Sequence, residues 1–165
     1  MARGAAERPV TVSVIDRLLD DEPAVAQEPI PTRSQSLRML KNAVRRDIEW
    51  LLNTRPPVDP LPEGDSELRR SVYNYGLPDL VSLSSKSESN YAQVARMMEN
   101  VLATFEPRLA NIRVKVADAP ADKPFTLRFI IEGMLRIDPA PEYIAFDTAL
   151  ELMSGEYEVR GENAQ

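Results

Sequence analysis

Apolar residues recur at helical spacing in two long stretches of the chain. Positions three and four residues apart share one face of a helix, so this spacing predicts amphipathic helices over residues 35–55 and 90–105. The first stripe consists of Leu37, Leu40, Val44, Ile48, Leu51 and Leu52, and the second of Tyr91, Val94, Met98, Val101, Leu102 and Phe105. Ser34 or Ser36 is expected to cap the first helix, Pro56 to end it, and Trp50 to join the core.

From Ile112 onwards the period of the apolar positions changes to two. The alternating runs are Ile112 to Val116, Phe125 to Ile131, continued by Leu135 and Ile137, Ile144 to Leu152, and Tyr157 to Val159. Gly133 lies on the apolar face, which indicates a bulge or a close backbone approach, and Ser154-Gly155 suits a tight turn. The pattern predicts an α+β fold, with two main helices packed on one face of an antiparallel β-meander.

The N-terminal region has a different organisation. Val14, Ile15, Leu18 and Leu19 predict a short helix within residues 10–21, and residues 22–33 form an acidic, proline-rich linker. This helix either anchors a partner or folds back on its own domain. We therefore divide the chain into an N-terminal tail (1–33), a single α+β domain (34–160) and a disordered tail (161–165).

Residues 56–89 connect the two predicted helices. Gly76 and Pro78 exclude one continuous helix through residues 68–83, so we expect a short strand or turn followed by a helical turn. Ser85 and Glu88 match a capping box for the second helix, with Ser89 as the alternative cap.

Composition excludes several classes of function. The net charge of −6 leaves no basic excess for general nucleic-acid binding. The 165 residues include no cysteine and no histidine, which excludes disulfides, thiolate nucleophiles, the usual zinc sites and imidazole catalysis. No signal peptide and no apolar run of about 20 residues is seen, so we expect a cytoplasmic protein without direct membrane insertion.

No enzymatic site stands out among the 26 acidic residues. Asp47 and Glu49 are two residues apart on a helix, so their side chains do not face each other. The six glycines are scattered and form no phosphate-binding loop. By elimination, the sequence predicts no catalytic residues, no cofactor and no metal.

Glu106-Pro107-Arg108 is the most distinctive short segment. Glu106 precedes a proline and therefore ends the second helix, at the pole where the helix dipole disfavours a negative charge. Arg108 is the nearest compensating cation, and a cationic group on another chain is the next. The segment is thus either a local ion pair or a docking point for a partner.

Four segments together resemble a known family. They are Val14 to Asp20, Val44 to Arg55, Ser71 to Leu80, and Phe105 to Leu109. In this order the chain, from about residue 12 to 160, resembles the TssE proteins. These are small baseplate subunits of bacterial type VI secretion systems, within the lysozyme-like baseplate wedge family of contractile phage tails.

The resemblance implies a structural role and a set of partners. TssE-like proteins sit in wedges with TssF, TssG and TssK, around a VgrG hub, where the TssB/TssC sheath begins to assemble at a baseplate docked on the inner membrane. The family's assembly motif maps onto Glu106, Pro107 and Arg108, and an open sheet edge offers the sheath a template. Two alternatives remain: a peptidoglycan-cleaving hydrolase, which a cell-wall turbidity assay would reveal, and a stand-alone adaptor of the same fold.

Overall fold

A computed structural model gives the structure of the chain and describes residues 9–11, 13–18, 30–57, 66–78, 88–118 and 125–161. Its helical elements are α1 (Val14–Leu18), α2 (Arg33–Asn53), α3 (Ser66–Arg70), the 3-10 helix η1 (Val72–Asn74) and α4 (Glu88–Phe105). Its strands are β1 (Leu109–Ala117), β2 (Thr126–Leu135), β3 (Glu142–Glu151) and β4 (Tyr157–Arg160).

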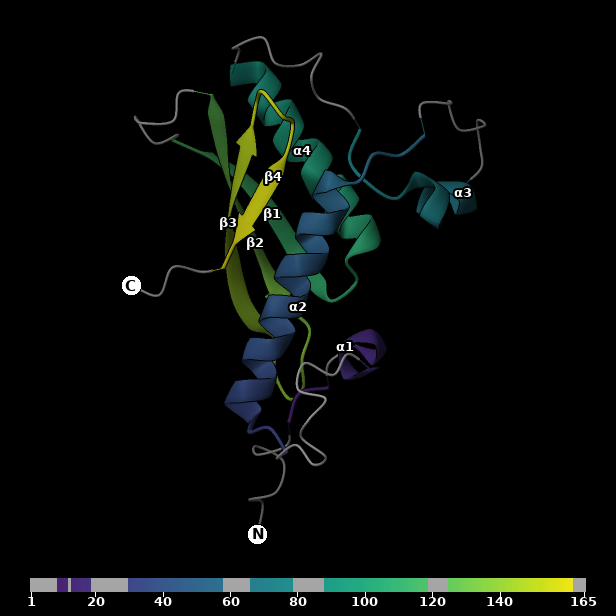
Figure 1. The fold of residues 1–165 in the computed structure, drawn as a ribbon, viewed down its shortest axis with the longest axis vertical. Helices are drawn as coiled ribbons and strands as arrows, with labels where there is room; N and C mark the ends of the chain where they lie inside the picture. Colours follow the sequence, from purple (N-terminus) through teal and green to yellow (C-terminus); the bar gives the residue numbers. More distant parts are fainter. Residues whose placement is uncertain are drawn as a thin grey trace.

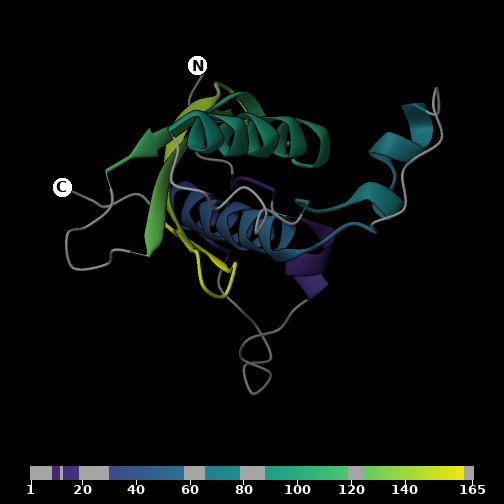
Figure 2. The same ribbon diagram turned by 90° about the horizontal axis from the view of Figure 1, so that it is seen from above.

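The four strands form one antiparallel sheet in chain order, β1-β2-β3-β4. Helices α2 and α4 lie side by side on one face of this sheet, while α3 lies away from it (Figures 1 and 2). The predicted α+β fold, with two main helices on one face of a β-meander and a short N-terminal helix, is therefore confirmed. None of the helices in the described ranges is long and apolar enough to cross a membrane.

The core lies between the two helices and the sheet. The apolar stripes predicted from the sequence supply its helical half, because Val44, Ile48 and Met98 are fully buried. Phe129, Ile131 and other inward-facing strand residues supply the opposite half. Each fully buried side chain of this size contributes about 1.5–3 kcal/mol relative to an exposed one, so the core holds both helices firmly against the sheet.

The start of α2 differs from the prediction. The cap is Thr32, whose side chain accepts a hydrogen bond from the backbone N–H of Gln35, while the side chain of Gln35 accepts one from the Thr32 N–H. This reciprocal capping box satisfies two N–H groups that the helix itself leaves unpaired. The sequence contains the Thr-x-x-Gln pattern, which the choice of Ser34 or Ser36 overlooked. For α4, the predicted cap Ser85 lies outside the described residues.

Trp50 is exposed, so its prediction as a core residue is wrong. Its side chain is 60% exposed at the edge of the apolar stripe, and the guanidinium group of Arg46 lies 5.0 Å from the centre of its ring. At this distance an arginine is attracted to the face of an indole ring. The neighbours Leu51 and Leu52 take the buried positions on this turn of α2 instead.

Residues 66–78 contain α3 and η1, and no strand occurs in this range. Gly76 has φ of +122°, and a Cβ atom there would lie 2.4 Å from the backbone oxygen of Thr54. The next residue, Leu77, is fully buried and donates its N–H to the same oxygen at 2.9 Å. Glycine is therefore required where this segment docks on the end of α2.

A β-bulge follows the turn between α4 and β1. The register between β1 and β2 shifts between Ala110 and Arg113, and Asn111 there has φ of 54°, which asparagine tolerates better than most residues. Across the pair, a Cβ atom on Gly133 would lie 3.4 Å from the oxygen of Ala110. The close approach predicted for Gly133 is present, and the bulge lies opposite it on β1.

Candidate functional site

The turn Glu106–Arg108 joins the end of α4 to the start of β1. The N–H of Glu106 donates to Leu102 at 2.9 Å, and the oxygen of Glu106 accepts from Leu109 at 3.1 Å. On the far side, the N–H of Arg136 donates to the oxygen of Arg108 at 2.8 Å. The turn is thus fastened to α4, to β1 and to the end of β2, and Pro107 is exposed on its outer side.

The carboxylate of Glu106 points inward and is bound by Arg108. Glu106 is only 4% exposed, although it is charged and stands at the end of a helix. It accepts hydrogen bonds from the Arg108 backbone N–H at 3.2 Å, from Nε at 2.7 Å and from Nη2. A buried charge requires such a partner, and a two-pronged arginine contact fixes its geometry. The local ion pair, one of the two alternatives left open by the sequence, is present.

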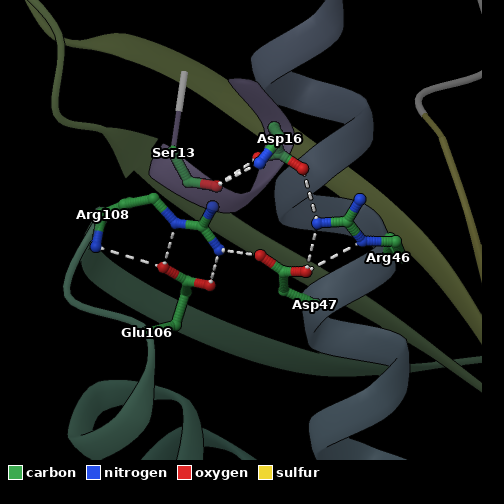
Figure 3. Close-up of polar contacts among 6 residues, drawn as sticks. All are labelled: Ser13, Asp16, Arg46, Asp47, Glu106 and Arg108. Carbon is green, nitrogen blue, oxygen red and sulfur yellow. Dashed lines mark hydrogen bonds and ion pairs between the residues drawn. The ribbon is translucent and has the colours of Figure 1, made fainter. Parts of the chain in front are cut away.

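Arg108 also links the turn to α2 (Figure 3). Its Nη2 atom donates to Asp47 Oδ2 at 2.7 Å, and Arg46 donates to Asp47 Oδ1 from Nε at 3.0 Å and from Nη2 at 2.9 Å. Two guanidinium groups therefore share the carboxylate of Asp47, one on each of its oxygens. This contact bridges 61 positions of the sequence.

The same network continues to α1. Arg46 Nη2 donates to Asp16 Oδ1 at 2.8 Å, and the hydroxyl of Ser13 donates to Asp16 Oδ2 at 2.6 Å (Figure 3). In contrast, the apolar residues Val14 and Ile15 of α1 are 69% and 67% exposed. Helix α1 is thus held through polar contacts. We call the six connected residues the charged brace: Ser13, Asp16, Arg46, Asp47, Glu106 and Arg108.

The contacts of the charged brace favour the ionised forms of Asp16, Arg46 and Arg108. Hydrogen bonds from Arg108 to Glu106 raise the pKa of Arg108 above its ordinary value, against the opposing effect of burial. Burial alone raises the pKa of Asp16, but hydrogen bonds from Ser13 and Arg46 outweigh it, and the net result is a lowered pKa. Acidic and basic side chains alternate along the network, so each charge is next to an opposite one.

A groove runs beside the charged brace. Arg33, Arg108 and Arg136 contribute to its walls, together with Asp138 and residues 9–11 and 13 of the N-terminal segment. The side chain of Arg108 remains 26% exposed here, and its Nη1 atom has no hydrogen-bond partner within the described ranges. Three arginines from separate parts of the fold therefore surround one depression.

The arrangement suits binding better than catalysis. A general acid requires a protonated carboxyl group, whereas each carboxylate of the charged brace is bound by at least one arginine. A second groove is lined by Glu49, Glu151, Glu156 and Glu158, of which Glu49 pairs with Arg45 and Glu151 accepts a hydrogen bond from Ser154. In the described ranges, no group of three or more acidic side chains is arranged to hold a metal ion.

Sequence reasoning identified two of the six residues of the charged brace, Glu106 and Arg108. Glu106 and Arg108 were candidates, with Pro107 between them, and the structure places the two charged side chains in contact. Asp47 was considered only in relation to Glu49, and Arg46 and Asp16 were not candidates. The sequence around Asp47 carries no signal of a contact with Arg108, which follows 61 positions later, and the sequence around Asp16 carries none of its contact with Arg46. The docking role of Glu106, Pro107 and Arg108 remains a prediction.

Comparison with known proteins identifies the family to which the chain belongs. A family model described as baseplate wedge protein gp25 matches residues 38–140, which include Asp47 and the whole turn Glu106–Arg108. No curated protein sequence matches the chain. The match covers more than half of the chain and runs from α2 to the end of the β2–β3 connection. The chain therefore belongs to the baseplate wedge protein gp25 family, a family of structural proteins of phage-type baseplates.

Proposed function

We propose that this protein is a structural baseplate subunit of a type VI secretion system, where it links the wedge to the contractile sheath and helps to start sheath assembly. Membership of the baseplate wedge family supports the structural role. The resemblance of four ordered segments to TssE proteins supports the secretion system. Its wedge partners are then TssF, TssG and TssK, placed around a VgrG hub, and its sheath partner is TssB/TssC.

The charged brace supports different roles for the residues of Glu106-Pro107-Arg108. The carboxylate of Glu106 is buried, so it acts on partners by holding Arg108 in place. Pro107 is exposed, and the side chain of Arg108, which is 26% exposed, lines the groove. We assign the docking contact to the outer surface of Pro107 and Arg108.

The groove indicates the chemistry of the wedge contact. Arg136 is exposed and has no ion pair within the described ranges, and it lines the groove together with Arg108 and Arg33. A carboxylate on a partner could bind two of these guanidinium groups, as arginines bind carboxylates elsewhere. The single observation that carries the proposal is the position of Arg108, which Glu106 and Asp47 hold by hydrogen bonds and which lines a groove together with Arg33 and Arg136.

The test is a pull-down of co-expressed TssF, TssG and TssK with charge-reversal variants. Arg136→Glu changes the groove without touching the charged brace, and Arg38→Glu reverses an exposed arginine on α2 that does not line the groove. We expect Arg136→Glu to lose the wedge proteins and Arg38→Glu to keep them, with unchanged thermal melts for both. Equal capture by the two variants would place the wedge contact elsewhere on the protein.

A further inference from the structure

The N-terminal segment of the described structure, residues 9–11 and 13–18, lies beside α2, and we call it the N-terminal strap (Figure 1). A buried serine of α2 holds its first part. The N–H of Val10 donates to Oγ of Ser36 at 2.8 Å, and the Ser36 hydroxyl donates in turn to the oxygen of Arg33 at 2.9 Å. Ser36 is only 1% exposed, and Val10 is partly buried against the core. This serine therefore anchors the strap to the first turn of α2.

The second attachment of the strap is the ion pair between α1 and α2. Arg46 donates to Asp16 at 2.8 Å (Figure 3), about three helical turns beyond Ser36. The apolar side chains of Val14 and Ile15 add little to this attachment, because both are exposed. The strap is thus fixed at two points by single side chains of α2. A segment with so few buried apolar contacts detaches more easily than the core.

The strap forms part of the groove that contains Arg108. Val10, Thr11 and Ser13 line this groove together with Arg108 and Arg136. Without the strap, the two guanidinium groups would stand on an open surface, where water screens their attraction for a carboxylate. With the strap attached they lie in a depression, and the hydroxyl of the exposed Thr11 offers a further donor to an acidic partner. The strap therefore contributes both shape and polar groups to the groove.

We propose that the N-terminal strap is part of the wedge-binding site, and that Ser36 and Asp16 are positioning residues that hold it at the groove. The ligand is an acidic segment of a wedge protein, whose carboxylates bind Arg108 and Arg136 while the same segment contacts the strap. This inference rests on the proposed function, which places the wedge contact at this groove. Because the partner binds best when the strap is attached, a bound partner must in turn stabilise the attached strap.

The first test removes the serine anchor. Ser36→Ala deletes the acceptor of the Val10 N–H, and alanine is a better helix former than serine, so α2 is kept. The matched control Ser34→Ala deletes an exposed hydroxyl on the same turn, whose hydrogen bond is with Thr32. With the purified TssF–TssG–TssK complex as the probe, we expect Ser36→Ala to weaken binding about fivefold or more, because the strap is attached for less of the time. Ser34→Ala should bind like the wild type.

The second test removes the other attachment. Asp16→Asn deletes the charge that binds Arg46. The matched control Arg17→Gln changes the next residue, which is exposed and forms no ion pair within the described ranges. We expect Asp16→Asn to weaken binding of the same complex in the way that Ser36→Ala does, and Arg17→Gln to leave it unchanged. Thermal melts of all four variants check that the domain itself stays folded.

Hydrogen exchange on the wild-type protein measures the coupling without any variant. The amide of Val10 should exchange more slowly in the presence of the wedge complex, because the bound partner keeps the strap attached. The amide of Tyr157 donates to Asn53 at the other end of α2 and serves as the reference, whose rate should not change. A strap that only stabilised the fold would leave the exchange of Val10 independent of the wedge complex.

The outcomes separate this inference from the proposed function. The strap is no part of the site if the wild type binds the wedge complex and Arg136→Glu does not, while Ser36→Ala and Asp16→Asn bind like the wild type and Val10 is not slowed. Tighter binding by these two variants would show that the strap obstructs the groove, which also overturns the inference. If the wild type does not bind the wedge complex at all, the proposed function is wrong, and this inference fails with it.

Discussion

Two arginine–carboxylate pairs in this protein have the same chemistry and different surroundings. Arg108 binds Glu106 through Nε and Nη2 at the turn between α4 and β1. Arg128 binds Asp147 through the same two nitrogens, both at 2.7 Å, on the face of the sheet that the helices leave open. The side chain of Glu106 is 5% exposed and that of Asp147 is 23% exposed, while Arg128 is 37% exposed.

The comparison shows that the role of an ion pair depends on its position. The pair on the sheet joins two neighbouring strands that already share a full ladder of backbone pairing. The pair at the turn joins α4 to β1, and through Asp47 it also joins both to α2. Removing one charge from the exposed pair lets water replace it, whereas removing one from the buried pair leaves its partner without compensation.

The largest loss of stability is expected for the substitution Glu106→Gln. Glutamine has one acceptor oxygen in place of two, and its NH2 group would face a donor of Arg108, so Arg108 loses the two-pronged contact and the charge of its partner inside the turn. We expect the free energy of unfolding to fall by about 3 kcal/mol, measured by urea denaturation with the m-value unchanged. A loss below about 1 kcal/mol would mean that the buried pair is worth no more than a surface pair.

A smaller effect is expected for Asp147→Asn, the matched change in the exposed pair. The free energy of unfolding should fall by less than about 1 kcal/mol, because the pair is partly solvated and screened. The difference from the wild type should shrink further at high salt. Urea denaturation at low and high salt measures both values. If Asp147→Asn were as destabilising as Glu106→Gln, the contrast between the two pairs would disappear.

The smallest effect on stability is expected for the contact of Asp16, which lies at the outer end of the charged brace. Its pKa in the folded protein lies below the ordinary value of 3.8, mainly because hydrogen bonds from Ser13 and Arg46 outweigh burial. The contact therefore stabilises the folded state above pH 3.8, and this stabilisation is lost as the pH falls through the lowered pKa. We expect α1 to leave α2 in this acid range while the main core stays folded.

Fluorescence of Trp50, the single tryptophan, reports this release, because Arg46 connects its ring to Asp16. The wild type should show a change in emission below pH 3.8 that the variant Asp16→Asn lacks. An identical acid profile for both proteins would show that Asp16 does not control the position of α1.

The fold was predictable because its signals are local and repeated. The stripes that contain Ile48 and Met98 predicted both long helices, and the alternation around Phe129 and Phe146 predicted the meander. The wrong predictions concern single residues, namely the cap of α2 and the burial of Trp50. Thr32 caps α2 although Ser34 and Ser36 had the same type of side chain. Residue type alone also placed Trp50 in the core, whereas its angular position on α2 exposes it.

The charged brace was predictable only in part. Glu106 and Arg108 are two residues apart, so a contact between them follows from local geometry. The contact of Arg108 with Asp47 requires knowing which turn of α2 faces the start of β1, and that follows from the packing of the whole core. The division of the chain at residues 33 and 160, and the docking role of the turn, stay predictions until partners are tested.

Side chains of α2 cover the β4 edge of the sheet, because the Asn53 amide binds the N–H and the oxygen of Tyr157 and Arg45 donates to the oxygen of Val159. A sheet with two open edges could be extended on both sides and could join several copies into an indefinite row. Asn53 and Arg45 occupy outward backbone groups of Tyr157 and Val159, so a further strand can pair with β4 only by displacing these side chains. Side chains of α2 thus protect this edge of the sheet from pairing with other chains.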